Sequence, residues 1–407
     1  MRICFVSRRY FPAVSGMSIY AVNLLRELVA DGHDVTMISQ YYDGEHATVY
    51  GGGPPPQVPG VKVVGLPALG EQDGGDFERD IETMIATVAR EHAIRPFDIL
   101  HAQYGYPTGW AALLASADLA VPCVVSIQGG DGHWVGSCCA THFTAFRRVL
   151  DHAGALLIGG ESFVAEVSDR MGVPPSRFTR VPGAVDTTRF TPRQAIGSVA
   201  ARPRLLYHGR IDRRKGVLDF IEALALLRGR DIGFEAIISG IGPDVAPAET
   251  LAAQLGFAAP MLRFTGASSY ESTPAVYGNA DIFASPTYAE GFSNTILEAM
   301  ASRLPVASCK VVGVTDCLRD GENGVLTEAG DVAAHAEALA RLIADSALRT
   351  RLATRALEEC RAKYSWKVVG RQIVGVYESL IGTVPAKSFR RDIERVPCRF
   401  REQPHLL

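Results

Sequence analysis

Short apolar runs alternate with amphipathic helical patterns in both halves of the chain, and this alternation limits the possible folds more than any other feature. Strands separated by helices pair side by side into parallel sheets covered on both faces. A length of 407 residues is also more than one core usually organises. The sequence therefore predicts an α/β protein of two doubly wound, Rossmann-like domains facing a central cleft. The predicted strands span residues 2–7, 35–39, 97–101, 121–127, 155–160, 204–208, 234–239, 261–265, 280–284 and 305–308.

Composition and hydropathy favour a globular protein, with 47% hydrophobic and 21% charged residues. No apolar run approaches the roughly 20 residues that cross a bilayer. The first predicted strand starts at residue 2, which leaves no room for a signal peptide before it. We therefore expect no integral membrane segment and a cytoplasmic location.

The cysteines are scattered and form no C-x-x-C pair. The adjacent pair Cys138-Cys139 is expected only to pack, and we expect neither a zinc site nor a disulfide framework. A reducing compartment fits this usage. The eight cysteines are Cys4, Cys123, Cys138, Cys139, Cys309, Cys317, Cys360 and Cys398.

Charge is distributed unevenly between the two halves. Residues 1–190 hold 14 Lys and Arg against 20 Asp and Glu, a net charge of −6, whereas the remainder holds 27 against 24, a net charge of +3. An acidic first half argues against nucleic acid and anionic membranes as partners. The sequence makes no prediction of oligomeric state.

A loop and helix at residues 285–301 carry two carboxylates around a potential phosphate site. Ser293 or Asn294 can cap the helix, whose first N–H groups and dipole suit an anion. Glu290 precedes the cap and Glu298 lies over a turn inside the helix. The two carboxylates could accept hydrogen bonds from sugar hydroxyls on either side of a diphosphate. The alternative is a solvated Glu and a helix-dipole Glu beside an ordinary loop.

A second loop, residues 209–216, carries a cluster of cations before a predicted helix at residues 217–228. Arg210 and Lys215 would offer one bidentate and one point-charge contact to a diphosphate. The alternative is a solvated basic loop. Glycines in three further strand-to-helix loops would let the backbone approach a ligand, and Gly16, Gly240 and Gly242 are the residues concerned.

These motifs resemble the retaining nucleotide-sugar glycosyltransferases of family 4, which have the GT-B fold. Glu290-Gly291-Phe292 followed by Glu298-Ala299-Met300-Ala301 resembles their E-x7-E signature, and residues 209–216 resemble their G-R-x4-K-G motif. Residues 181–192 resemble the N-G-V-D…F-x-P linker between their domains, with Gly183-Ala184 in place of Asn-Gly.

The resemblance implies the domain organisation. Residues 1–192 would form the acceptor-binding domain and residues 193–365 the nucleotide-sugar-binding domain. A final helix, residues 366–382, would pack back onto the first domain, and residues 383–407 read as a tail.

The resemblance also implies roles for residues of the second domain. Arg210 and Lys215 would bind the donor phosphates and Glu290 a donor-sugar hydroxyl, so these three are the expected catalytic residues. Glu298 would hold the ribose hydroxyls. The expected donor-binding residues are Gly16, Gly209, Gly240, Gly242, Gly291, Phe292, Ser293, Asn294, Thr295 and Glu298.

The first domain departs from the family pattern at two positions. Ser15 occupies the first position of a loop that usually carries two glycines there. Gln128 stands where a His is expected, and an amide side chain cannot act as a general base. We expect Gln128, Asp131 and His133 to contact the acceptor, although a lone His in a Gly-rich loop is more often structural or solvated.

The resemblance implies a retaining, metal-independent transfer from a nucleoside diphosphate sugar, most commonly a UDP sugar, by front-face substitution. No cofactor is expected. The acidic first domain favours a small neutral or cationic soluble acceptor, such as an aminocyclitol or amino sugar. Three alternatives remain: a GT-B epimerase or phosphorylase, a non-catalytic nucleotide-sugar-binding protein, and an NAD-type oxidoreductase. The last lacks its G-x-G-x-x-G fingerprint in this sequence.

Overall fold

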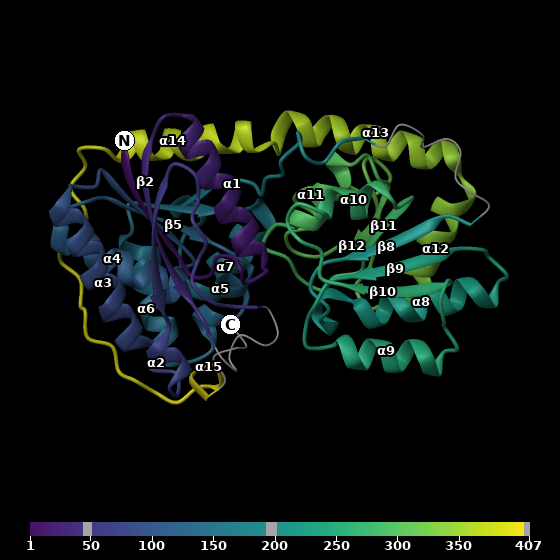
Figure 1. Ribbon diagram of the computed structural model, residues 1–407, viewed down its shortest axis with the longest axis horizontal. Coiled ribbons are helices and arrows are strands. Elements are labelled where there is room, and N and C mark those ends of the chain that lie inside the picture. The colour runs from purple at the N-terminus through teal and green to yellow at the C-terminus, as the bar shows by residue number, and fades with distance from the viewer. Residues whose placement is uncertain (44–50, 193–201, 403–407) are drawn as a thin grey trace. The chain divides into compact units, whose positions relative to one another are not determined.

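The computed structural model describes residues 1–43, 51–192 and 202–402 and divides the chain into two compact units (Figure 1). The first unit comprises Met1–Pro182 and Val369–Leu407, and the second comprises Gly183–Val368. The division thus precedes the expected boundary between residues 192 and 193, and residue 193 lies outside the described residues.

The first unit is built on a seven-stranded parallel sheet with the order β3-β2-β1-β4-β5-β6-β7. The order reverses between β1 and β4, and such switch points are where doubly wound sheets bind ligands. The strands are β1 (Arg2–Ser7), β2 (Asp34–Tyr41), β3 (Val61–Pro67), β4 (Ile99–Gln103), β5 (Cys123–Ile127), β6 (Ala155–Ile158) and β7 (Phe178–Arg180).

The longer helices between these strands bury an apolar side. In α1 the side chain of Ser15 caps the first turn by accepting from Ser18 N at 3.2 Å, and Leu24, Leu25 and Leu28 are fully buried. The helices are α1 (Gly16–Ala30), α2 (Leu69–Gln72), α3 (Phe77–Ile94), η2 (Gly105–Gly109), α4 (Trp110–Leu119), α5 (Gly129–His133), η3 (Val135–Ser137), α6 (Ala140–His152), α7 (Glu161–Met171), η4 (Pro175–Arg177), α14 (Trp366–Leu380) and α15 (Arg399–Glu402).

The second unit has a six-stranded parallel sheet with the order β10-β9-β8-β11-β12-β13. The strands are β8 (Arg204–His208), β9 (Glu235–Ser239), β10 (Leu262–Gly266), β11 (Ile282–Ser285), β12 (Val306–Cys309) and β13 (Val325–Thr327). The helices are η5 (Arg213–Lys215), α8 (Val217–Gly229), α9 (Val245–Gln254), α10 (Thr273–Gly278), α11 (Asn294–Ala301), α12 (Val332–Ala344) and α13 (Ser346–Lys363).

Both faces of this second sheet are buried. Leu205 and Tyr207 of β8 pack into a core with side chains of α8 and α12. Leu206, the residue between them, packs into a separate core with side chains of α11 and α13. Alternate residues of one strand therefore serve two cores, as in a sheet covered by helices on both sides. The prediction of two Rossmann-like domains is confirmed.

The last part of the chain differs from the expected tail. From Val369 onward it belongs to the first unit, where Tyr377 of α14 lies 2.5 Å from His101 of β4. Beyond α14, the extended segment also packs against the first unit, and Cys398 and Phe400 are buried. Residues 384–402 are thus part of the domain surface.

Within the described residues, no helix combines the length and the apolar character that crossing a membrane requires.

Candidate active site

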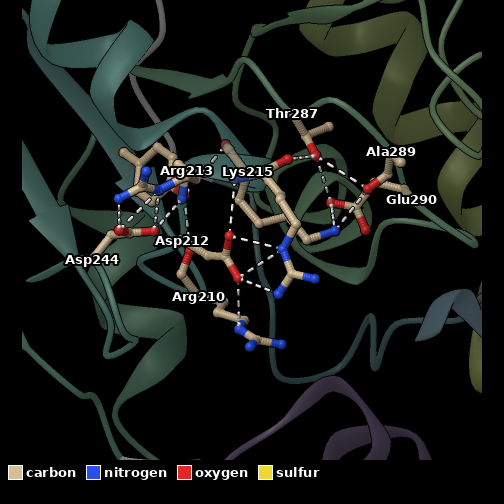
Figure 2. Close-up of polar contacts among 10 residues, drawn as sticks. Arg210, Asp212, Arg213, Lys215, Asp244, Thr287, Ala289 and Glu290 are labelled. Carbon is tan, nitrogen blue, oxygen red and sulfur yellow. Dashed lines mark hydrogen bonds and ion pairs between the residues drawn. The ribbon is translucent and has the colours of Figure 1, made fainter. Parts of the chain in front are cut away.

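An ion pair joins two loops of the second unit at the carboxyl ends of adjacent strands. Lys215 Nζ lies 3.0 Å from Glu290 Oε1 and donates to the carbonyl of Ala289 at 2.8 Å. Thr287 Oγ1 donates to the same Glu290 oxygen at 3.3 Å. Figure 2 shows Lys215 reaching across to Glu290 and Ala289. Two of the three expected catalytic residues therefore lie together.

The two loops meet because β8 and β11, the strands that lead into them, are neighbours in the sheet. Their backbones are in direct contact: Tyr288 N donates to the carbonyl of Arg214 at 3.0 Å. Gly216 has a φ of +75°, and a Cβ there would lie 1.9 Å from the carbonyl oxygen of Pro286. The glycine that ends the cation loop is needed for this contact.

The remaining cations of the loop are held by two aspartates. Arg214 Nη2 lies 2.6 Å and Arg210 Nε 3.2 Å from Asp212 Oδ2. Arg213 lies 2.8 Å from Asp244 and points away from the Lys215–Glu290 pair (Figure 2). Burial raises the pKa of Asp212, but hydrogen bonds from Arg214 and the charges of Arg214 and Arg210 outweigh it and lower the pKa overall. The ionised Asp212 carboxylate thus positions the Arg210 side chain within this loop.

Glu298 is enclosed inside the domain. The Tyr277 hydroxyl of α10 donates to Glu298 Oε2 at 2.7 Å. Burial raises the pKa of Glu298 to about 7, against the opposing hydrogen bond from Tyr277 and the charge of Arg189. The sequence pattern did not single out Tyr277, because a buried tyrosine normally belongs to the core and nothing in its spacing links it to residue 298.

The start of α11 leaves backbone donors for a ligand. Ser293 occupies the cap position, but no side chain of the described residues caps the helix, and Ser293 Oγ instead lies 3.2 Å from Thr295 Oγ1. The first N–H groups of a helix have no intrahelical acceptor. With the helix dipole, such groups suit an anion, and donor binding at Ser293, Asn294 and Thr295 stays a prediction.

Gly291 and Phe292 link Glu290 to this helix start. Both follow the loop directly, and Phe292 packs against Tyr364 with ring centroids 5.5 Å apart. A Cβ on Gly183 would lie 2.6 Å from the Phe292 ring. This close contact explains the glycine in the linker.

The glycines after β8 and β9 pack against each other. Gly209 and Gly240 have φ values of +138° and +146°, and a Cβ on Gly240 would lie 1.7 Å from the carbonyl oxygen of Gly209. A Cβ on Gly242 would lie 2.1 Å from the carbonyl oxygen of Ile211. Their close approach is to protein backbone, and contact of these three glycines with a donor stays a prediction.

Gly313 packs directly against the backbone of Glu290. Glu290 N donates to the carbonyl of Val312 at 3.1 Å, and a Cβ on Gly313 would lie 2.1 Å from the carbonyl oxygen of Glu290. Gly313 lies in the turn of residues 312–316, which follows β12. Its role is to place Glu290.

In the first unit, the loop after β5 is organised around Asp131. This buried carboxylate accepts hydrogen bonds from the backbone N–H groups of Gln128 (2.7 Å), Gly132 (3.1 Å) and Gly105. Burial raises its pKa to about 7 although these bonds oppose the shift. We interpret Asp131 as a positioning residue that fixes the loop, and its contact with an acceptor stays a prediction.

The other two expected acceptor residues differ in exposure. Gln128 is half-buried, at the end of β5. His133 is buried, with Nδ1 2.8 Å from Glu166 Oε1 and its ring 4.7 Å from that of Phe163. The structural alternative given for His133 therefore fits its surroundings better. Gly16 opens α1, directly after the Ser15 cap.

Two Rossmann-like domains, with paired cations and carboxylates beside a helix N-terminus in the second, define a glycosyltransferase of the GT-B type. The model of the family "Glycosyl transferases group 1" matches residues 189–359, and that of "Glycosyl transferase 4-like domain" matches residues 15–184. The chain belongs to the family 4 glycosyltransferases and is an enzyme of the hexosyltransferase type.

Curated relatives align with much of this chain at low sequence identity. D-inositol 3-phosphate glycosyltransferase of Salinispora tropica is 28% identical over 89% of this chain and 80% of its own length. The enzyme of that name from Corynebacterium urealyticum is 29% identical, and the alignment spans 58% of each chain.

Two solved structures have the same fold. Sucrose-phosphate synthase from Thermosynechococcus elongatus superposes with a TM-score of 0.77 and 22% identity, over 93% of this chain and 98% of its own. Anabaena HepE, in complex with UDP and glucose, gives a TM-score of 0.73 at 18% identity, over 93% and 100%.

Proposed function

We propose that this enzyme is a retaining glycosyltransferase that moves a hexose from a nucleoside diphosphate sugar, with UDP as the nucleotide, to a hydroxyl of a small acceptor, without a metal ion. The observation that carries the proposal is the Lys215–Glu290 pair, with Arg210 on the same loop and the α11 N-terminus on the next. Cations and helix N–H groups supply the charge stabilisation that a departing diphosphate needs. The UDP complex of Anabaena HepE supports the choice of nucleotide.

Each charged group has a chemical task in this proposal. Lys215 and Arg210 bind the diphosphate and offset the negative charge that grows as the bond from the anomeric carbon to the phosphate oxygen breaks. Glu290, held by Lys215, accepts a hydrogen bond from a sugar hydroxyl. Glu298, held by Tyr277, accepts hydrogen bonds from ribose hydroxyls.

The transfer itself needs no protein nucleophile. The acceptor oxygen forms its bond to the anomeric carbon on the face that the diphosphate leaves, so the configuration is retained. The acceptor proton passes to the departing phosphate oxygen. Among the second-unit side chains, Glu290 is paired with Lys215 and Glu298 is buried against Tyr277. Neither is placed as a nucleophile.

The proposed charge of the acceptor rests on the net charge of the first domain. A net charge of −6 over residues 1–190 favours a neutral or cationic molecule, such as an aminocyclitol or amino sugar. The D-inositol 3-phosphate glycosyltransferases act on an anionic acceptor by their name. Assays of an aminocyclitol against an inositol phosphate, at low and high salt, separate the two. Saturation by the anionic compound alone would overturn the cationic acceptor.

A thermal-shift panel of UDP, GDP, ADP and TDP tests the donor site. We expect UDP to raise the melting temperature of the wild type and to raise that of Glu298→Ala much less. Glu337→Ala is a matched control, because this exposed carboxylate of α12 pairs with Arg230 and lies outside the donor-site loops. No shift with any of the four nucleotides at millimolar concentration would contradict the proposal and favour a binding role for another ligand.

Product analysis then separates transfer from the alternative reactions on this fold. We expect a glycosylated acceptor with the anomeric configuration of the donor and an equivalent amount of UDP. An isomerised sugar without an acceptor would indicate an epimerase instead. Equal turnover with and without added Mg²⁺ or Mn²⁺ is expected if no metal ion takes part in the transfer.

A further inference from the structure

Three cysteines and one histidine converge in the first unit. Cys138 and Cys139 precede α6, His142 lies in its first turn, and Cys398 comes from the segment after α14. The sulfur atoms and the imidazole nitrogen all lie within 4.8 Å of one another. We propose that these four side chains bind a structural zinc ion, which fastens the C-terminal segment to the first domain.

The geometry suits a tetrahedral ion with thiolate and imidazole ligands. Nδ1 of His142 lies 2.8 Å from Cys138 Sγ and 3.9 Å from Cys398 Sγ, so one ring nitrogen faces sulfurs from both segments. Zinc–sulfur bonds of about 2.3 Å place tetrahedral ligand atoms about 3.8 Å apart. Ligand atoms within 4.8 Å of one another need only small shifts to reach this spacing.

The surroundings suit a closed site of the structural kind. His142 and Cys398 are buried, and Cys138 and Cys139 are half-buried. The His142 ring packs against Tyr106 at 4.4 Å and against Phe77 at 5.4 Å between centroids. Four protein ligands in a largely dry shell leave no open position for a substrate, as in structural Cys₃His sites.

The helix also favours the charge of such a site. Three thiolates and one neutral imidazole around Zn²⁺ carry a net charge of −1. Cys139 is the cap residue of α6, and its sulfur accepts from His142 N at 3.5 Å. The positive end of the helix dipole therefore stabilises the thiolates at this place.

Other contacts bring the C-terminal segment to the same helix. Thr141 Oγ1 donates to the carbonyl of Glu394 at 2.7 Å and accepts from Val396 N at 2.9 Å. These bonds fix the backbone two residues before Cys398. A zinc ion would link residues 142 and 398, which are far apart in the sequence. It would also fix the segment around Cys138 and Cys139, which follows the Asp131 loop. Its role is in positioning rather than in the transfer reaction.

The first experiment measures metal content of the full chain. The protein is purified without chelator and reduced, and its zinc content is measured by inductively coupled plasma mass spectrometry. We expect about one zinc ion per chain. Replacement by Co²⁺ should give the intense visible bands of a tetrahedral ion and the near-ultraviolet thiolate charge-transfer band. A wild-type chain that takes up neither metal overturns the proposal.

Variants then locate the ion. Cys398→Ser should weaken zinc binding by at least about 100-fold, with circular dichroism showing that both domains remain folded. Cys309→Ser is the matched control, because this buried cysteine lies on β12 of the other unit. Cys398→His should retain the ion, since it preserves four ligands. Wild-type affinity in Cys398→Ser, or metal loss in Cys309→Ser, contradicts the assignment.

A disulfide is the competing use of the same cysteines. It would leave six titratable thiols instead of the eight of the sequence after purification without reductant, and peptide mapping would find Cys398 joined to Cys138 or Cys139. This result, with no bound metal after reduction, overturns the proposal. Eight thiols titratable only after chelation support it.

Discussion

Lys215 and Glu290 belong to loops that are 75 positions apart in the sequence, yet each fixes the other at 3.0 Å. The pair also has further partners, because Lys215 donates to Ala289 and Thr287 donates to Glu290. Both groups are thus positioned before a substrate arrives, which lowers the cost of ordering them in the transition state. Loss of one charge leaves the other less well placed.

At the residue scale, we expect Lys215→Ala to lower kcat by about 10²–10³-fold, because a cation that stabilises the leaving diphosphate is removed. The fold should persist, since the Lys215 side chain is partly exposed. Arg213→Ala is the control: it removes a cation of the same loop that is paired with Asp244. Steady-state kinetics with one donor series measures both. Similar rates in wild type and Lys215→Ala would contradict the site assignment.

Glu298 leads to a prediction about stability and pH. Its pKa is raised from 4.5 to about 7 by burial, so the folded protein keeps a proton that the unfolded chain releases between these values. The free energy of unfolding should therefore fall as pH rises through this window, by at most about 1.4 kcal/mol per pH unit for this group. Glu298→Gln, which does not titrate, should show a shallower fall.

Urea unfolding at several pH values between 5 and 7.5 measures this slope. Asp131, whose pKa burial also raises to about 7, contributes a second fall in the first unit. Asp131→Asn should therefore flatten the profile independently of Glu298→Gln. Parallel profiles for wild type and Glu298→Gln would mean that Glu298 is ionised in the folded protein.

At the element scale, the sequence predicted the long buried strands and the loops that carry the donor-site charges. Strands such as β1 and β8 contain short continuous apolar runs, which indicate buried strands of a parallel sheet. Edge strands β7 and β13 are only three residues long and carry too little pattern to be recognised. Helix α6 was missed because its apolar positions are interrupted by histidine, threonine and arginine side chains.

Contacts between side chains from distant segments also could not be predicted from the sequence. Nothing in the pattern links Tyr277 to Glu298, or Cys398 to His142, since each pairing depends on how helices and loops meet in three dimensions. The Cys138-Cys139 pair was noticed but was expected only to pack. Spacing along the chain cannot reveal a fourth ligand more than 250 residues away.

The turn behind Glu290 provides a test at this scale. Gly313→Ala introduces a Cβ 2.1 Å from the Glu290 carbonyl oxygen at a φ of +76°. The loop must move, so we expect kcat to fall at least about 10-fold, as misplacement by 1 Å can cost more. Gly321→Ala is the control, because it has a φ of +71° but no atom within 4 Å of its Cβ.

Backbone strain is similar in the two variants, roughly 1–2 kcal/mol, so their difference isolates the contact with Glu290. Melting temperatures and kcat are measured for both. If Gly321→Ala and Gly313→Ala reduce kcat equally, general destabilisation and not the position of Glu290 would explain the loss.

At the scale of the whole chain, the first unit is completed by segments from both ends of the sequence. Val369–Leu407 belongs to the unit that Met1 begins. The extended part after α14 is fixed by polar contacts along its length, among them Arg391 with Asp118 at 2.7 Å and Arg148 with the carbonyl of Asp392 at 3.0 Å. Exposed ion pairs contribute little stability, so the buried contacts near α6 matter more.

Thr141 is the most informative of these contacts, because its hydroxyl both donates to Glu394 and accepts from Val396. Thr141→Val keeps the shape of the side chain but removes both hydrogen bonds. We expect it to lower the free energy of unfolding of the first unit by about 1–3 kcal/mol. Thr250→Val is the control, since this exposed hydroxyl donates to the Ala246 carbonyl within α9 of the other unit.

Chemical unfolding, with limited proteolysis between residues 384 and 398, measures the effect of the two substitutions. Faster cleavage there in Thr141→Val alone would indicate that α6 holds the segment, whereas equal cleavage in both variants would show that the segment is secured by other contacts.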